Sequence, residues 1–140
     1  MAHRAGAETE WVTTSVGRHS VSGMNMNILQ RQIDGITLID MSGRLDSSVS
    51  GQVMDQLNEI VNAGNTRLVV NLGHVSYISS AGLRSILVAA KLVKSANGEM
   101  RLCQPNDLVK RILEESGFAN LIRIDDDEVQ SIAALSVHRD

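Results

Sequence analysis

Hydrophobic and polar positions divide the chain into a polar beginning and a longer, regularly patterned remainder. Residues 1–23 show no hydrophobic period and are rich in small polar side chains, so we expect a flexible tail there, followed by one domain at 24–140. A tail that folds back as an extra strand, held by Trp11 and Val12, is the alternative.

The patterned region alternates between strand and helix signals. Strands are expected at 27–33, 36–41, 67–72, 99–103 and 121–124. Helices are expected where apolar residues recur every three or four positions, at 49–61, 80–96, 108–113 and 129–135. Asp34-Gly35 between the first two strands is a strong two-residue hairpin signal. Ser47 or Ser48 could cap the first helix.

This order predicts the fold class. Strand–helix–strand crossovers favour parallel pairing, so the chain is expected to be a single α/β domain. Its mixed five-stranded sheet would begin with an antiparallel hairpin, continue with parallel strands, and carry about four helices. The acidic run Asp125 to Glu128 is expected to complement the dipole of the last helix, whose apolar side would be Val129, Ile132, Ala133 and Leu135.

Composition narrows the function classes. The 140 residues are 43% hydrophobic and 21% charged, as in ordinary globular domains, with a net charge of −3 and only 2% aromatic residues. That balance argues against nucleic acid as a partner. No apolar run approaches the ~20 residues that cross a bilayer, and the start lacks the pattern of a secretory signal. We therefore expect a soluble, cytoplasmic protein with no membrane insertion.

Candidate chemistry is sparse. Cys103, the single cysteine, cannot form an internal disulfide, and its strand pattern favours a buried thiol. The histidines have no metal-ligand spacing, and His74 is expected to be a loop residue. The G-x-S-x-G elbow and the phosphate-binding glycine motifs are absent. We expect no catalysis, cofactor or metal.

The least ordinary segment is 74–84, which leads from the most apolar strand into a helix. Its residues Ser79, Ser80, Ala81 and Gly82 are all small, and the first turn contains no Asp or Glu. A helix start with accessible amides suits a phosphate group. Ser79 or Ser80 could equally serve only as the N-cap of that helix.

Several segments carry a family resemblance. Residues 75–83 resemble the signature loop of the STAS family, which anti-sigma factor antagonists share with the tails of sulphate transporters. Residues 42–46 resemble the Gly-x-Leu-Asp turn of that family, and 98–103 and 116–118 fit its later elements. The resemblance extends from about Asn27 to Leu135 in the family's order.

The resemblance to the anti-sigma factor antagonist branch implies a phosphorylated serine. By position this is Ser80, and Asp46 matches the aspartate that lies near it. The family usually places Asp immediately before that serine, whereas this chain has Ser79. Since a kinase normally supplies its own base, phosphorylation can survive the change, and Ser79 becomes a competing site.

The implied function is partner switching. The unphosphorylated protein would bind an anti-sigma factor that is also a serine kinase, phosphorylation at Ser80 would release it, and a serine phosphatase would reset it. The expected partner-binding residues are Asp46, Ser79, Ala81, Gly82, Arg84, Val88 and Lys91. On the same helix, the side expected to face the sheet is Leu83, Ile86, Leu87 and Ala90.

Two other functions remain open from the sequence. One is a STAS adaptor subunit that is never phosphorylated, in a transporter or another signalling complex. The other is a small serine hydrolase using Ser80, for which no base or acid is suitably spaced. No strong apolar stripe argues for an obligate dimer, so we expect a monomer when the protein is free.

Overall fold

The computed structural model describes residues 12–16 and 26–137. In chain order the elements are β1 (Val12–Val16), β2 (Met26–Ile33), β3 (Ile36–Leu45), α2 (Ser50–Asn62), β4 (Arg67–Ile78), α3 (Ser80–Ser95), β5 (Glu99–Cys103), α4 (Asp107–Glu115), the 3-10 helix η1 (Phe118–Asn120), β6 (Arg123–Asp125) and α5 (Glu128–Val137). The predicted alternation of helices and strands after the hairpin is confirmed.

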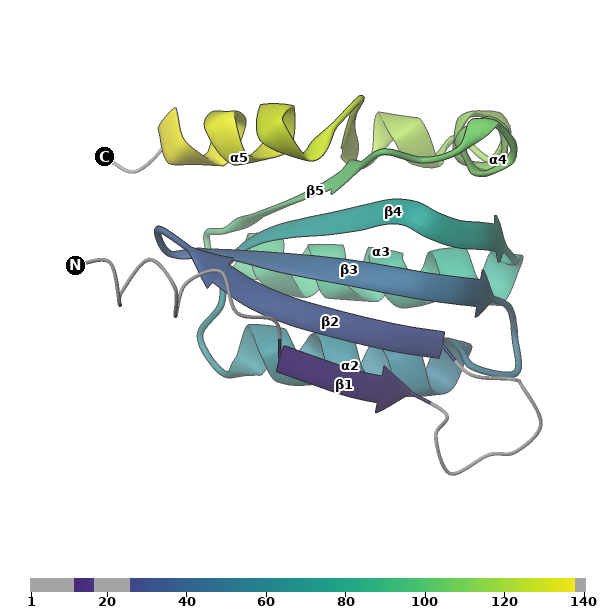
Figure 1. The fold of residues 1–140 in the computed structure, drawn as a ribbon, viewed down its shortest axis with the longest axis horizontal. Coiled ribbons are helices and arrows are strands. Elements are labelled where there is room, and N and C mark those ends of the chain that lie inside the picture. The colour runs from purple at the N-terminus through teal and green to yellow at the C-terminus, as the bar shows by residue number, and fades with distance from the viewer. Residues whose placement is uncertain (1–11, 17–25, 138–140) are drawn as a thin grey trace.

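The described strands form one mixed sheet in the order β1-β2-β3-β4-β5-β6 (Figure 1). β2 and β3 pair antiparallel, and the pairs from β3 to β6 are parallel. Asp34 and Gly35 both have positive φ, 52° and 81°, as the tight hairpin turn requires. The α/β fold with an opening antiparallel hairpin is therefore confirmed.

The sheet has one strand more than the five predicted. Val12–Val16 pairs antiparallel with β2, which is the extra-strand alternative for this part of the predicted tail. The outer edge of β2 otherwise presents unpaired backbone N–H and C=O groups, and β1 supplies their partners. Trp11 and the remainder of 1–23 lie outside the described residues.

β3 and β4 run further than their predicted ends and carry irregular pairing on the way. Shifts in the β3–β4 register fall between Asp40 and Ser42 and between Gly43 and Arg44. Bulges of this kind let a twisted strand continue while they redirect its side chains. β4 reaches Ile78, and His74 lies within the strand rather than in the predicted loop.

Side chains alternate between the two faces of the sheet and form two buried clusters. Leu68 and Leu72 of β4 join the larger cluster with residues of α2, α3 and α4, whereas Val69 joins a smaller one that includes Leu135 of α5. Figure 1 shows α2 and α3 together behind the strands and α5 apart from them. The larger core therefore supports the helix that begins at Ser80.

Two predictions near the C-terminus are wrong in detail. The short strand lies at 123–125 instead of 121–124, so Asp125 belongs to β6 rather than to the acidic start of the helix. In α5, Val129 is 74% exposed and Ala133 is also exposed, although both were expected to face the core.

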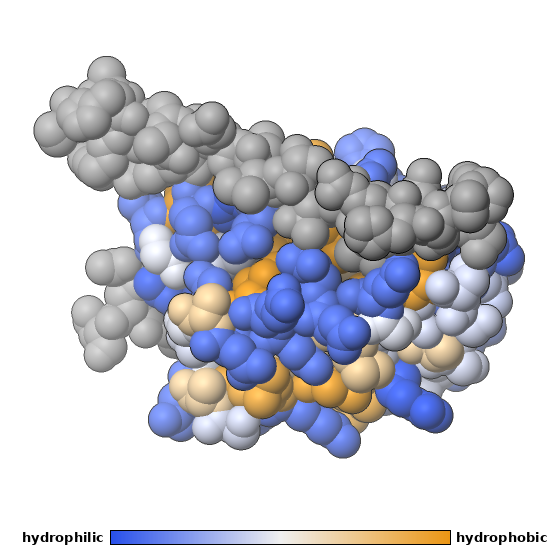
Figure 2. Space-filling view, turned by 90° about the horizontal axis from the view of Figure 1, so that it is seen from below, coloured by the Kyte–Doolittle hydropathy of each residue, from blue (hydrophilic) through white to orange (hydrophobic). Residues whose placement is uncertain are grey.

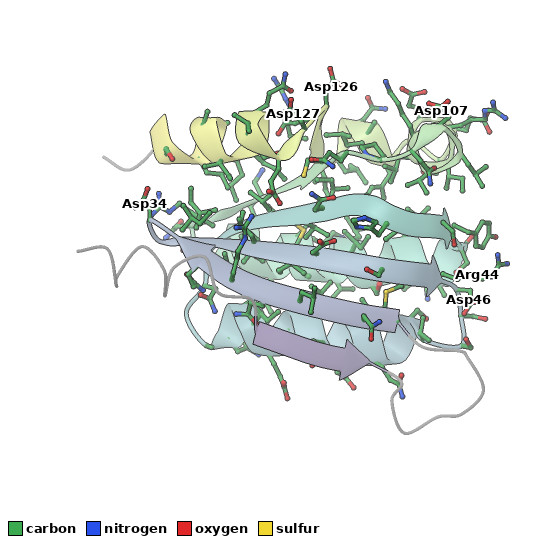
Figure 3. The ribbon with its side chains drawn as sticks, in the orientation of Figure 1. Asp34, Arg44, Asp46, Asp107, Asp126 and Asp127 are labelled. Carbon is green, nitrogen blue, oxygen red and sulfur yellow. The ribbon has the colours of Figure 1, made fainter. Side chains whose placement is uncertain are left out.

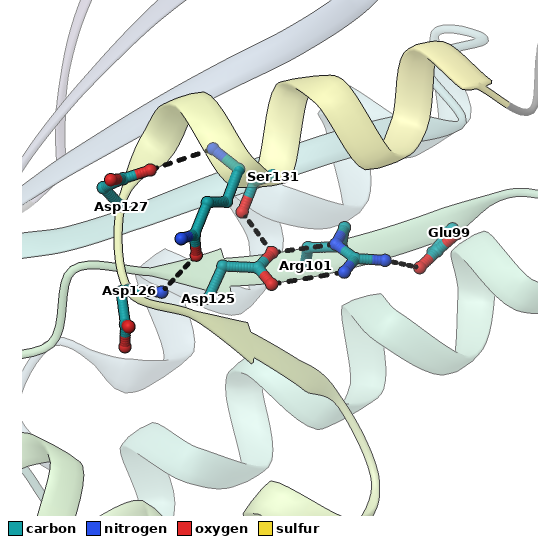
Figure 4. Close-up of polar contacts among 7 residues, drawn as sticks. Glu99, Arg101, Asp125, Asp126, Asp127 and Ser131 are labelled. Carbon is teal, nitrogen blue, oxygen red and sulfur yellow. Dashed lines mark hydrogen bonds and ion pairs between the residues drawn. The ribbon is translucent and has the colours of Figure 1, made fainter.

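A polar contact joins α5 to the edge of the sheet. The side of α5 that faces the sheet carries Ser131, Ile132 and Leu135. The Ser131 hydroxyl donates to Asp125 Oδ2 at 2.6 Å (Figure 4). This bond ties α5 to β6, and Val129 lies on the solvent-facing side of the helix.

Among the described residues, no helix is long and apolar enough to cross a membrane. Figure 2 views the molecule from below and shows mainly hydrophilic residues with smaller hydrophobic areas between them. The outer side of α2 is polar because Gln52, Asp55 and Glu59 are exposed there, while Val53 and Leu57 are buried.

Candidate functional site

The candidate site lies where β3 and β4 end and α3 begins. Leu45, the last residue of β3, pairs with Ile78, the last residue of β4. The Ser79 N–H also donates to the Leu45 carbonyl at 2.9 Å. Asp46 and Ser80 therefore leave adjacent strand ends, as the family resemblance implied. Figure 3 shows Asp46 at this end of the sheet.

Ser79 is the N-cap of α3. It has extended backbone angles, φ −88° and ψ 174°, and its hydroxyl accepts a hydrogen bond from the Gly82 N–H at 3.1 Å. The sequence left the cap open between Ser79 and Ser80, and the geometry assigns it to Ser79. A hydroxyl in this arrangement satisfies an amide that the helix itself leaves unpaired.

Ser80 is the first residue of α3, and it is exposed. Its hydroxyl has no hydrogen-bond partner within the described part of the chain. α3 has no acidic residue in its first turn. The Ser80 hydroxyl is therefore accessible to another protein, and no neighbouring carboxylate on the helix would repel an added phosphoryl group.

Asp46 closes the turn between β3 and α2. Its Oδ1 accepts from the Ser48 N–H at 3.0 Å and from the Ser48 hydroxyl at 2.6 Å, and its Oδ2 lies 3.2 Å from Arg44 Nε. The hydrogen bond from the Ser48 hydroxyl is the main reason that the pKa of Asp46 is lowered. Asp46 thus holds the shape of the loop beside Ser80.

This turn corrects the predicted cap of the first helix. The N-cap of α2 is Val49, which has no side chain that can accept a hydrogen bond, so neither Ser47 nor Ser48 fills that position. Instead, the Asp46 carbonyl accepts from the N–H groups of Val49 and Ser50, at 3.2 and 3.0 Å. The carboxylate and the carbonyl of Asp46 thus accept hydrogen bonds from the backbone N–H groups at the start of α2, the role expected of a capping serine.

Arg44 and Tyr77 form the outer edge of the site, and no role was predicted for either residue. The Arg44 guanidinium carbon lies 4.4 Å from the centre of the Tyr77 ring, and the Arg44 side chain is 63% exposed. The two residues are Cα partners in the β3–β4 register. Because they are far apart in the sequence, only the strand pairing reveals the contact.

Gly82 has a packing role. It is buried, and a Cβ at this position would lie 2.5 Å from the Leu45 carbonyl oxygen and 3.1 Å from Ile78 Cγ2. Gly82 was grouped with the expected partner-binding residues, but its surroundings are the two strand ends. Its neighbour Ala81 is only partly buried.

The outer surface of α3 carries positive charge. Arg84 and Lys91 are exposed and Val88 is half-buried, so these predicted partner-binding residues lie on an accessible side of the helix. Lys94 adds a further exposed cation, and the helix contains no Asp or Glu. These positive charges are suited to pair with acidic groups on another protein.

The buried side of α3 matches the predicted one only in part. Ile86 is fully buried, whereas Leu83, Leu87 and Ala90 are half-buried against the core. The other buried positions of the helix are Val93 and the small residues Gly82, Ser85 and Ala89. Small side chains let α3 approach the sheet and α2 closely.

Other candidate groups lie away from this site. Burial raises the pKa of the Cys103 thiol to about 12, as expected for a buried strand cysteine. His74 Nδ1 is 3.6 Å from Asp40 Oδ1. In the described ranges no three His, Cys, Asp or Glu side chains gather closely enough to hold a metal ion.

Comparison with known proteins places this arrangement in a family. The family model named "STAS domain" matches residues 27–131. The chain is 33% identical over 109 residues to BtrV of Bordetella bronchiseptica, covering 78% of this chain and 94% of that protein. It is 32% identical over 115 residues to the anti-sigma F factor antagonist of Paenibacillus polymyxa, covering 81% and 98%.

The fold has a solved counterpart as well. The crystal structure of an anti-sigma factor antagonist from Mycobacterium paratuberculosis superposes with a TM-score of 0.75, covering 82% of this chain and 97% of that one at 16% identity. The match to the family model covers most of the chain, and both curated relatives are matched over nearly their full length. The chain belongs to the STAS domain family.

Proposed function

We propose that this protein is an anti-sigma factor antagonist that is switched by phosphorylation at Ser80. In its unphosphorylated form it binds an anti-sigma factor that is also a serine kinase, and phosphorylation releases it. The observation that carries this proposal is that the two adjacent serines at the start of α3 have different environments. Ser79 caps the helix, which leaves the neighbouring Ser80 hydroxyl exposed and without a partner among the described residues. Relatives named as anti-sigma factor antagonists support it.

The phosphoryl transfer needs little from this chain. Ser80 Oγ attacks the γ-phosphorus of ATP, the new O–P bond forms, and the bond to the β,γ-bridging oxygen breaks to release ADP. A base of the kinase accepts the hydroxyl proton, so a carboxylate at position 79 is not required. For the reset, a serine phosphatase directs water onto the phosphorus, and Ser80 Oγ leaves with a proton as inorganic phosphate departs.

The docking surface extends from the strand ends along α3. Arg84, Val88 and Lys91 are accessible there, and they suit a partner with acidic side chains around an apolar centre. Asp46 keeps the adjoining β3–α2 turn in shape. A phosphate adds close to two negative charges to this surface. A loss of ~1.4 kcal/mol in binding free energy already weakens the complex tenfold.

The test uses candidate serine kinases from the organism's own genome with ATP, followed by intact mass measurement. We expect one added phosphoryl group on the wild type and on Ser79→Asp, and none on Ser80→Ala. Ser79→Asp is the matched control because aspartate keeps the helix cap while it removes the competing hydroxyl.

Each other outcome has a definite meaning. Phosphate that persists in Ser80→Ala but is lost in Ser79→Asp would move the site to Ser79. Folded wild-type protein that no cognate kinase modifies would overturn the proposal and favour the unphosphorylated adaptor function. The purified unphosphorylated protein, run alone on a size-exclusion column, tests the expected monomeric state of the free protein.

A further inference from the structure

Ser80 and Arg84 are neighbours on the surface of α3. They are four residues apart in the same helix, and both are exposed. Residues at this spacing have Cβ atoms about 5–6 Å apart. A phosphate on Ser80 would therefore lie within reach of the Arg84 guanidinium without any change in the backbone.

Among the described residues, Arg84 has no ion-pair or hydrogen-bond partner, unlike the other arginine near the site. Arg44 is held by Asp46 at 3.2 Å and by the ring of Tyr77. Within the described residues, Arg84 makes no ion pair or hydrogen bond, and α3 contains no acidic residue that could compete for it. Lys91 is seven residues further along the helix, about 10 Å away along its axis, and is therefore too distant to replace Arg84.

We infer that Arg84 pairs with the phosphate when Ser80 is phosphorylated, an inference that rests on the proposed function. A guanidinium presents a planar fork of N–H donors that matches two phosphate oxygens. Phosphorylation then changes the docking surface in two ways. It adds negative charge at Ser80, and it withdraws from the partner a cation that the unphosphorylated protein offers.

The test installs phosphoserine at position 80 during protein synthesis, so that no kinase is involved. Phosphorus NMR then follows the second ionisation of the phosphate as pH is varied. An opposite charge nearby favours the dianion and lowers this pKa. We expect the pKa in Arg84→Gln to lie about half a unit or more above the value in the otherwise unchanged protein. Arg84→Lys should recover part of the difference.

The controls separate Arg84 from its surroundings. Lys91→Gln removes the same charge from the same helix and should leave the phosphate pKa unchanged. The dipole of α3 acts equally in every variant, so it cancels in the comparison. Circular dichroism confirms that the exposed substitutions leave the fold intact.

An unchanged phosphate pKa in folded Arg84→Gln would overturn the inference. If Arg44→Gln shows the rise instead, the phosphate pairs with the strand arginine. Failure of the proposed function is visible separately, because it appears as absence of kinase-dependent modification in the mass measurement and leaves this titration unaffected.

Discussion

At the residue scale, Ser79 is the position at which this chain departs from the STAS signature. The family usually has aspartate at this place, and both residue types are good N-caps because each offers an oxygen to the amides of the first turn. Here the Ser79 hydroxyl accepts from the Gly82 N–H. The substitution therefore keeps the helix start while it removes a negative charge beside Ser80.

A pair of substitutions at Ser79 tests this explanation. Ser79→Ala loses the cap and should lower the free energy of unfolding by about 1 kcal/mol. Ser79→Asp should match or slightly exceed the wild type, since a carboxylate also interacts favourably with the N-terminal end of the helix dipole. Urea denaturation followed by circular dichroism measures both. Equal loss of stability in the two variants would contradict the capping role.

At the element scale, α3 rests on the ends of β3 and β4 through a glycine. The backbone of α3 comes so close to Leu45 at Gly82 that no side chain fits between them. This contact fixes the height of the helix start, and with it the position of Ser80 relative to the β3–α2 turn that Asp46 holds. Packing of the element thus sets the geometry of the exposed hydroxyl.

The close approach can be tested with two glycine-to-alanine substitutions. Gly82→Ala places a methyl group against a backbone carbonyl that cannot move away cheaply, and it should cost about 1–3 kcal/mol of stability. Gly51→Ala in α2 is the matched control, because nothing lies within 4 Å of its Cβ position. That variant should be neutral or more stable by up to about 1 kcal/mol. Thermal unfolding compares the two, and a neutral Gly82→Ala would show that α3 can shift freely.

At the scale of the whole molecule, a largely buried ion pair joins β5 to β6, and its carboxylate also binds α5. Arg101 of β5 contacts Asp125 of β6 through Nε at 2.8 Å and Nη2 at 3.2 Å, and Nη1 contacts Glu99 at 2.7 Å (Figure 4). Burial by itself raises the pKa of Asp125, but the hydrogen bonds from Arg101 and Ser131 outweigh it, and the pKa is lowered. Three elements thus depend on one carboxylate.

Removing the arginine should destabilise the whole fold. Arg101→Gln leaves the largely buried Asp125 carboxylate without its cation and should lower the free energy of unfolding by about 2–3 kcal/mol at neutral pH. A carboxyl with a lowered pKa stabilises the folded state above its ordinary value of 3.8, and this contribution is lost as pH falls through the lowered value. The difference between variant and wild type should therefore shrink in acid.

Urea denaturation at a series of pH values measures this difference. Arg111→Gln, at an exposed position of α4, is the control and should stay within about 0.5 kcal/mol of the wild type. A gap between Arg101→Gln and wild type that is constant down to the lowest pH would contradict the role of Asp125.

The sequence by itself determined the order of the elements and indicated where the candidate site lies. Hydrophobic spacing and the Asp34-Gly35 turn are local signals, so they predict five of the strands and the four described α-helices from nearby residues alone. The signature segment likewise indicated that Ser79 and Ser80 stand at a helix start, which the structure confirms.

Only the tertiary structure decided how these parts meet. The choice of Ser79 over Ser80 as cap depends on a hydrogen bond, and the Arg44–Tyr77 contact depends on strand register. The side of α5 that faces the sheet depends on the burial of Leu135 and on the bond between Ser131 and Asp125. Each of these contacts depends on the distance and direction between two groups in the folded chain. The local spacing of hydrophobic residues does not specify such distances.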